Sequence, residues 1–140
     1  MKIVINTCFG GFNLSRKAVK RMAELQGREC FIFINDYKNK RFIFDDDKTI
    51  FWVAFDIPNP NKVLYNNKII NNTLYKKHCI SNKPDTRTDL LLIQVVEELG
   101  KEANGSYSEL KVIEIPDGIE YEIEEYDGNE YIAEKHRTWS

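Results

Sequence analysis

Two kinds of hydrophobic periodicity run along this chain, and the first predicts helices. After Ser15, apolar residues recur at helical spacing with lysine and arginine between them, and Gly27 follows as a helix-ending residue. The stretch LLLIQVVEELGKEANG, which follows DTRTD, also places apolar residues on one face and charged residues on the other. These two stretches predict the two main helices.

The second periodicity predicts β-strands. Short runs of β-branched and aromatic residues lie at 2–6, 30–35, 41–44, 50–55 and 110–115. Nearer the C-terminus, runs at 121–126 and 130–137 flank Asp127-Gly128, a strong signal for a two-residue hairpin turn. Together the elements predict an α+β fold with a mixed or antiparallel sheet, two main helices and a C-terminal β-hairpin.

The length of the chain fits a single domain. Its 140 residues are enough to bury a core, and no repeat or linker divides them. From about 56 to 84 the chain is rich in asparagine and lysine, and Pro58 and Pro60 interrupt any preceding element. We therefore expect one domain over 1–140, with a variable middle segment at about 56–84 that forms a loop or a weak pair of edge strands.

Composition and charge exclude several classes of protein. A hydrophobic share of 42% and a charged share of 30% fit a globular protein, and a net charge of −2 provides no field to capture long nucleic acids. The three cysteines form no C-x-x-C pair, which favours reduced thiols in a cytoplasm. No apolar run approaches about 18 residues and no signal peptide is evident, so we expect a cytoplasmic protein with no membrane partner.

The stretch CFGGF, from Cys8 to Phe12, provides the first candidate binding residues. It places Gly10 and Gly11 between Phe9 and Phe12, after a predicted strand and before a predicted helix. Backbone N–H groups of a glycine pair ahead of a helix N-terminus are able to bind an anion. The motif matches neither G-x-x-x-x-G-K-S/T nor G-x-G-x-x-G, so no named nucleotide-binding fold follows. The alternative is a tight turn made for packing, with both phenylalanines in the core.

An abrupt change of charge near the C-terminus provides the second group. Nine acidic residues and no basic one lie between Val112 and Glu134. A basic and aromatic group follows directly, made of Lys135, His136, Arg137 and Trp139. Guanidinium groups bind phosphates in a fork and indole rings stack on bases, so this group suits an anion-and-ring site. The alternative is a solvated acidic hairpin with a basic tail.

Arg87 is the third candidate. It lies in DTRTD, just before a predicted helix, where a loop is able to present a guanidinium to a ligand. The alternative is a salt bridge to Asp85 or Asp89.

Metal binding and catalysis are the minority readings. Glu122 and Glu124 share one face of a strand near Asp127, but acids on the wet face of a hairpin are far commoner than metal ligands, so we expect no metal or cofactor. His136 with Glu134 is the one base and orienting pair, and no G-x-S-x-G or H-x-x-E-H motif accompanies it. We therefore expect no enzyme, with a phosphodiesterase-like hydrolase as the alternative.

Two long segments resemble a family of small proteins of tailed phages and prophages. These are KIVINTCFGGFNLS at the start and DTRTDLLLIQVVEELGKEANGSYSELKVIEIPDGIEYEIEEYDGNEYIAEKHRTW at the end. In size and in its scattered arginines and aromatic residues the chain is also similar to phage Thoeris anti-defence proteins, which trap cyclic ADP-ribose-type molecules.

The resemblance implies a counter-defence protein in the host cytoplasm that sequesters a small nucleotide without cleaving it. Pyrophosphate would meet Gly10, Gly11 and either Arg87 or Arg137, and a base would stack on Trp139 or Phe12. A third hypothesis is an interaction protein whose acidic hairpin blocks a basic host surface.

Two structural expectations accompany these hypotheses. A shared site requires the N-terminal and C-terminal segments to be adjacent, with the strand at 2–6 beside the strand at 110–115. An aromatic run predicts a homo-oligomer, because it offers more aromatic surface than one small sheet needs for its core; its members are Phe42, Phe44, Phe51, Trp52 and Phe55.

Overall fold

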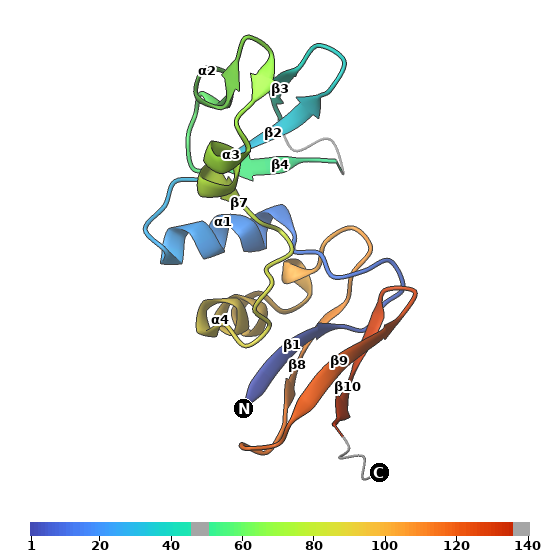
Figure 1. Cartoon of the computed structure of the whole chain (residues 1–140). Helices are drawn as coiled ribbons and strands as arrows, with labels where there is room; N and C mark the ends of the chain where they lie inside the picture. The colour runs from blue at the N-terminus through green and yellow to red at the C-terminus, as the bar shows by residue number, and fades with distance from the viewer. Residues whose placement is uncertain (46–50, 136–140) are drawn as a thin grey trace. The chain divides into compact units, whose positions relative to one another are not determined.

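The chain folds into two compact units. The structure is a computed structural model that describes residues 1–45 and 51–135. Unit 1 comprises Met1–Ala18 and Asn82–Ser140, and unit 2 comprises Val19–Ser81 (Figure 1). Both units contain helices and antiparallel strands, and this confirms the predicted α+β class. That the chain forms one domain, with a variable segment at 56–84, stays a prediction.

A central strand pair in unit 1 joins the N-terminal strand to a strand of the C-terminal segment. Strand β1 (Lys2–Asn6) pairs antiparallel with β8 (Leu110–Glu114), and Val4 lies opposite Val112. The β1 side chains from Ile3 onward are buried, as a short β-branched run predicts. The expected pairing of the strand at 2–6 with the strand at 110–115 is confirmed.

The predicted C-terminal hairpin is also confirmed. Strands β9 (Tyr121–Tyr126) and β10 (Asn129–Glu134) pair antiparallel, with Asn129 opposite Tyr126. The two turn residues have φ values of 51° for Asp127 and 88° for Gly128, as a type I′ turn requires. Figure 1 shows the hairpin running beside β1, which contacts β10.

One main helix completes unit 1. Helix α4 (Leu90–Leu99) begins after Asp89, whose carboxylate accepts hydrogen bonds from the N–H groups of Leu91 and Leu92. Its buried face packs on β1 and β8, and Gly100, with a φ of 57°, ends it. A short 3-10 helix, η1 (Gly100–Ala103), follows.

The other main helix, α1 (Arg16–Leu25), leads from unit 1 into unit 2. The hydroxyl of Ser15 accepts a hydrogen bond from the N–H of Ala18, which is the predicted N-cap. Gly27, with a φ of 71°, lies just beyond the C-terminus of the helix, as predicted. Local capping chemistry therefore fixes both ends.

Unit 2 is built on a four-stranded antiparallel sheet. Its spatial order is β3 (Arg41–Phe44), β2 (Phe31–Asp36), β4 (Val53–Phe55) and β7 (Cys79–Ile80). One core cluster consists of Phe33, Phe42, Phe55 and Leu64, and rings such as Phe42 and Phe55 meet edge to face with centroids 5.0 Å apart.

The prediction for the asparagine-rich segment was partly wrong. Strands β5 (Tyr65–Asn66) and β6 (Ile69–Ile70) form the expected weak pair. Two short helices flank them, namely α2 (Pro60–Leu64) and α3 (Asn72–His78). The cause is local, because Pro60 occupies the first turn of α2 and the Asn71 side chain caps α3. Proline and asparagine, which end one helix or strand, therefore also begin the next one here.

The aromatic run behind the predicted homo-oligomer is divided between core and surface. Phe42 and Phe55 are buried in the unit 2 core, whereas Phe44 is 69% exposed and Phe51 is 77% exposed. Two of the five aromatic residues behind the prediction are therefore used inside the fold, and oligomerisation stays a prediction.

Two further expectations concern membrane-spanning helices and the state of the cysteines. None of the helices among them has the length and apolar content that crossing a bilayer requires. Cys8, Cys30 and Cys79 are free and partly buried. Burial raises the pKa of the Cys30 and Cys79 thiols, which lowers their reactivity.

A charged cluster ties β4 to β7 in unit 2. The Asp56 carboxylate accepts hydrogen bonds from Arg28, with Nη2 at 3.0 Å, and lies 2.8 Å from Nδ1 of His78. Its backbone N–H also donates to the carbonyl of His78 at 2.9 Å. Burial alone would raise the pKa of Asp56, but the hydrogen bonds from His78 and Arg28 outweigh it and hold the pKa below its usual value.

We predict that Asp56→Asn destabilises the protein by about 1–3 kcal/mol at neutral pH, because Arg28 loses its carboxylate partner. The folded-state pKa of Asp56 is lower than the unfolded one, so its contribution is complete above about pH 5 and shrinks as the pH falls below about 4. Urea unfolding of wild type and variant across this range measures the difference. The control is Glu29→Gln, which changes an exposed carboxylate. A stability difference between wild type and Asp56→Asn that stays constant as the pH falls below about 4 would contradict the lowered pKa of Asp56.

Candidate functional site

The glycine pair at 10–11 lies directly against the turn of the C-terminal hairpin. The N–H of Gly10 donates to the carbonyl of Asp127 at 3.2 Å. A Cβ atom added at Gly128 would lie 2.8 Å from the nitrogen of Gly10 and 2.9 Å from the Cα of Gly11. A Cβ added at Gly10 would lie 2.8 Å from the backbone oxygen of Tyr107. Close approach of backbone to backbone therefore explains glycine at 10 and 128.

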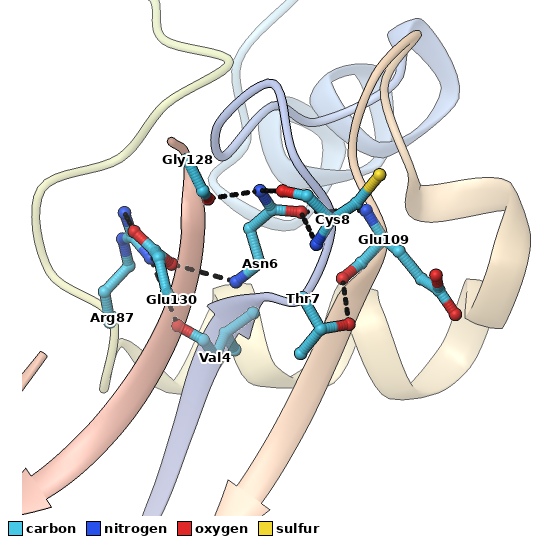
Figure 2. A network of polar contacts seen from close by, with 8 residues as sticks. All are labelled: Val4, Asn6, Thr7, Cys8, Arg87, Glu109, Gly128 and Glu130. Atoms are coloured by element: carbon cyan, nitrogen blue, oxygen red, sulfur yellow. Dashed lines mark hydrogen bonds and ion pairs between the residues drawn. The ribbon is translucent and has the colours of Figure 1, made fainter. Parts of the chain in front are cut away.

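Asn6 connects the loop, the hairpin turn and β8 through its side chain. Its Nδ2 donates to the carbonyls of Cys8 at 2.7 Å and Gly128 at 2.8 Å. Its Oδ1 accepts from the N–H groups of Glu109 at 2.9 Å and Cys8 at 3.3 Å. Figure 2 shows the amide between these partners. The side chain is fully buried and uses all four of its hydrogen-bonding positions.

A buried ion pair lies beside Asn6. Arg87 donates in a fork to Glu130, from Nη1 to Oε1 at 2.6 Å and from Nη2 to Oε2 at 2.9 Å. Oε1 also accepts the backbone N–H of Asn6 at 2.8 Å (Figure 2). The side chains are 14% and 8% exposed, and the guanidinium carbon lies 3.8 Å from the centroid of the Phe12 ring. This geometry is the bidentate arrangement that makes arginine–carboxylate pairs strong.

The partner of Arg87 differs from the ones expected. The alternative reading placed Asp85 or Asp89 in a salt bridge with it, but the carboxylate is that of Glu130, and Asp89 instead caps α4. The correction has a geometric cause, because Arg87 extends towards β1 and β10, whereas Asp89 turns to the helix N–H groups.

Six of the ten predicted ligand residues come together in this region. They are Cys8, Phe9, Gly10, Gly11, Phe12 and Arg87. Phe12 is buried, as the packing alternative expects, but Phe9 is 57% exposed. That any of them binds a ligand stays a prediction.

The remaining predicted residues do not join this region within the described chain. Lys135 follows the last residue of β10, and its N–H donates to the carbonyl of Glu120 at 3.0 Å. It lies at the opposite end of the hairpin from the turn, about 20 Å away at the usual rise of a strand. His136, Arg137 and Trp139 lie outside the described residues.

Sequence reasoning missed Asn6 and Glu130, although a signal existed for each. Asn6 is a polar residue at the end of a buried β-branched run. Glu130 is two residues from Ile132, so strand alternation places its side chain on the same face as an apolar one. A carboxylate on the inner face of a strand requires a charged partner.

Three exposed rings surround the glycine loop, and we call them the aromatic end. Phe9, Tyr107 and Tyr126 are 57%, 63% and 76% exposed. The rings of Phe9 and Tyr126 meet edge to face with centroids 6.4 Å apart, and the backbone of Tyr107 abuts Gly10. Large rings held this openly on a hydrogen-bonded base are typical of a partner surface.

Carboxylates accompany the aromatic end along the outer face of the hairpin. Glu122 and Glu124 share the face of Tyr126, and Tyr131 lies opposite Glu124. The hydroxyl of Tyr131 donates to Oε2 of Glu124 at 2.6 Å, and this bond raises the pKa of the tyrosine. Within the described residues, no three side chains able to ligate a metal gather at one point.

A separate hollow in unit 1 includes none of the predicted residues. Its lining includes Leu90 and Ile93 of α4, and the exposed Lys2–Glu97 ion pair lies beside them. Leu90 is 81% exposed there.

A scan against protein-family models finds no match for this chain, and comparisons with curated proteins and with solved structures find none either.

We predict that Gly128→Ala is much more damaging than Gly118→Ala. Both glycines have positive φ values, 88° and 82°, so each alanine is strained by about 1–2 kcal/mol. A Cβ at Gly118 meets open space, whereas one at Gly128 collides with the backbone of Gly10 and Gly11. We therefore expect a loss of about 3 kcal/mol or more at Gly128, measured by urea unfolding. Equal losses would show that the turn does not rest on the loop.

Arg87→Met should destabilise the protein by about 3–5 kcal/mol, because it leaves the Glu130 carboxylate buried without its partner. The matched control is Lys2→Met, which breaks an exposed ion pair with Glu97 and should cost less than about 1 kcal/mol. Chemical denaturation measures both.

The double variant Arg87→Met/Glu130→Gln isolates the ion pair. Gln still accepts the N–H of Asn6, so the double variant should recover at least about 1 kcal/mol of the Arg87→Met loss. Strictly additive losses, or an Arg87→Met loss no larger than that of Lys2→Met, would contradict a structural ion pair.

Proposed function

We propose that this protein acts by binding a partner rather than by catalysis, and that the aromatic end is the surface that binds. The observation that carries the proposal is the exposure of Phe9, Tyr107 and Tyr126 on a base that Asn6 and Glu130 hold in place. Aromatic side chains that are rigid before binding contribute most at interfaces, because little conformational entropy is lost on contact.

The charge around these rings favours a basic partner. The hairpin strands and turn at 121–134 contain six acidic residues and no basic one, and only Glu130 among them is buried. Such a surface attracts a basic protein segment and repels anions. Together with the resemblance to phage proteins, this supports a counter-defence protein that blocks a basic surface of a host factor.

Sequestration of a small nucleotide is the second candidate, and the exposed rings of Phe9 and Tyr126 favour it because aromatic rings stack on bases. The weaker part of this second candidate is how the protein would bind the phosphates of the nucleotide. Arg87 already has Glu130 as its partner, and Gly10 donates its N–H to Asp127. To bind phosphates, these groups would have to give up their present partners. Binding of a basic partner to the aromatic end requires no such rearrangement.

Calorimetric titration with a short arginine-rich peptide and, separately, with ADP-ribose and ATP tests both candidates. We expect the peptide to bind, more weakly at high salt, and Tyr126→Ser to reduce its affinity about tenfold. Leu90→Ser is the control, because it removes an equally exposed apolar side chain from the hollow in the same unit.

The outcomes separate the candidates. Nucleotide binding without peptide binding, with the nucleotide recovered intact, would replace the first candidate by the second. Recovery of a smaller product would favour the phosphodiesterase-like alternative. Loss of peptide binding in Leu90→Ser but not in Tyr126→Ser would place the binding surface elsewhere, and no binding of any probe would contradict both candidates.

A further inference from the structure

The two units carry opposite net charges. Residues 19–81 contain 11 lysines and arginines against 7 acidic residues, whereas 1–18 and 82–140 contain 9 against 15. These counts add up to the 20 basic and 22 acidic residues of the whole chain. The net charge of −2 therefore combines a unit of +4 with a unit of −6, and the unit of +4 has an electrostatic field of its own.

The turn between β2 and β3 presents an exposed aromatic ring that is followed by two lysines. Tyr37 is 81% exposed, and Lys38 and Lys40 are exposed beside it. The turn is held in shape by Asp36, which accepts hydrogen bonds from the side chain of Asn39 at 2.9 Å and from Arg41 at 3.1 Å. The hydrogen bond from Asn39 lowers the pKa of Asp36, and the bond from Arg41 lowers it further, so the carboxylate stays ionised.

The segment from α2 to α3 adds further positive charge to unit 2. Residues 59–78 contain four lysines and no acidic residue. Asn61 hydrogen-bonds both the N–H and the carbonyl of Phe42, at 2.6 and 2.9 Å, which places Lys62 next to β3. Figure 1 shows the β5–β6 hairpin, which carries Lys68, at the same end of unit 2 as the β2–β3 turn.

Tyrosine side chains connect the two segments. The Tyr65 ring of β5 lies 5.7 Å from that of Phe42 in β3, centroid to centroid. Burial raises the pKa of Tyr65, and the nearby phenol of Tyr37 raises it further. We call the exposed residues Tyr37, Lys38, Lys40, Lys62 and Lys68 of these two segments the basic turn surface.

We propose that the basic turn surface binds single-stranded nucleic acid, with a base stacked on Tyr37 and phosphates paired with the lysines. Exposed rings interleaved with cations are the usual means of binding single strands without sequence preference, since every base has a π-face and every linkage a charge. This departs from the expectation drawn from the net charge of the whole chain, which averages over two units of opposite sign.

Fluorescence anisotropy of a labelled oligothymidylate at low salt tests the proposal, with the unlabelled strand, ATP and a duplex of equal length as competitors. We expect Lys38→Glu/Lys40→Glu and Tyr37→Ser each to weaken binding about tenfold or more. The control is Lys101→Glu/Lys111→Glu, which makes the same charge change at exposed positions of unit 1 and should leave the affinity nearly unchanged.

Every outcome of this experiment bears on the proposal. Affinity that falls with salt and competition by the single-stranded oligonucleotide alone support it. Equal losses in the unit 1 control would reveal general charge attraction and overturn it. Competition by ATP as strong as by the strand would assign the surface to a mononucleotide, and absence of binding at low salt would overturn the proposal outright. Lys38→Gln/Lys40→Gln, a milder change in the same exposed turn, should weaken binding in the same direction.

Discussion

The carboxylate of Glu130 is the point on which unit 1 depends. Strands β1 and β10 contact each other but belong to different two-stranded sheets, so side chains must join them. Glu130 does this by accepting the main-chain N–H of Asn6 and the fork of Arg87. A buried carboxylate is tolerated only when it is both paired and hydrogen-bonded, and here it is both. One inward acid thus anchors an otherwise acidic, solvated hairpin.

This anchoring limits what the region is able to bind. Arg87, Gly10 and Asn6 resemble ligand-binding groups when they are taken one at a time, yet each has its hydrogen bonds within the fold. The groups that face outward are rings, namely Phe9 and Tyr126, with carboxylates beside them. The function is therefore best sought in what the rings contact, while the polar network beneath them supplies rigidity.

The parts of the fold that sequence reasoning predicted depend on local chemistry. Ser15, Gly27 and the Asp127-Gly128 turn act within a few residues, so their roles were readable without a structure. Proline and asparagine were ambiguous, because they end one element and begin another, and α2 and α3 were missed for that reason. The Arg87–Glu130 pair joins residues 43 positions apart, and no local pattern identifies which of several acids is the partner. The pairing of the strand at 2–6 with the strand at 110–115 was predictable only as a consequence of a functional hypothesis.

Charge is the property for which averaging over the chain misleads most. A surface attracts or repels a ligand over about one Debye length, which is about 8 Å at physiological ionic strength. Residues 59–78 contain four lysines and no acid, whereas the hairpin at 121–134 contains six acids and no basic residue. A net charge of −2 describes neither surface. The two surfaces differ in sign but both present exposed tyrosines. Under the two proposals the same aromatic chemistry would therefore serve partners of opposite charge, and the neighbouring charges would select between them.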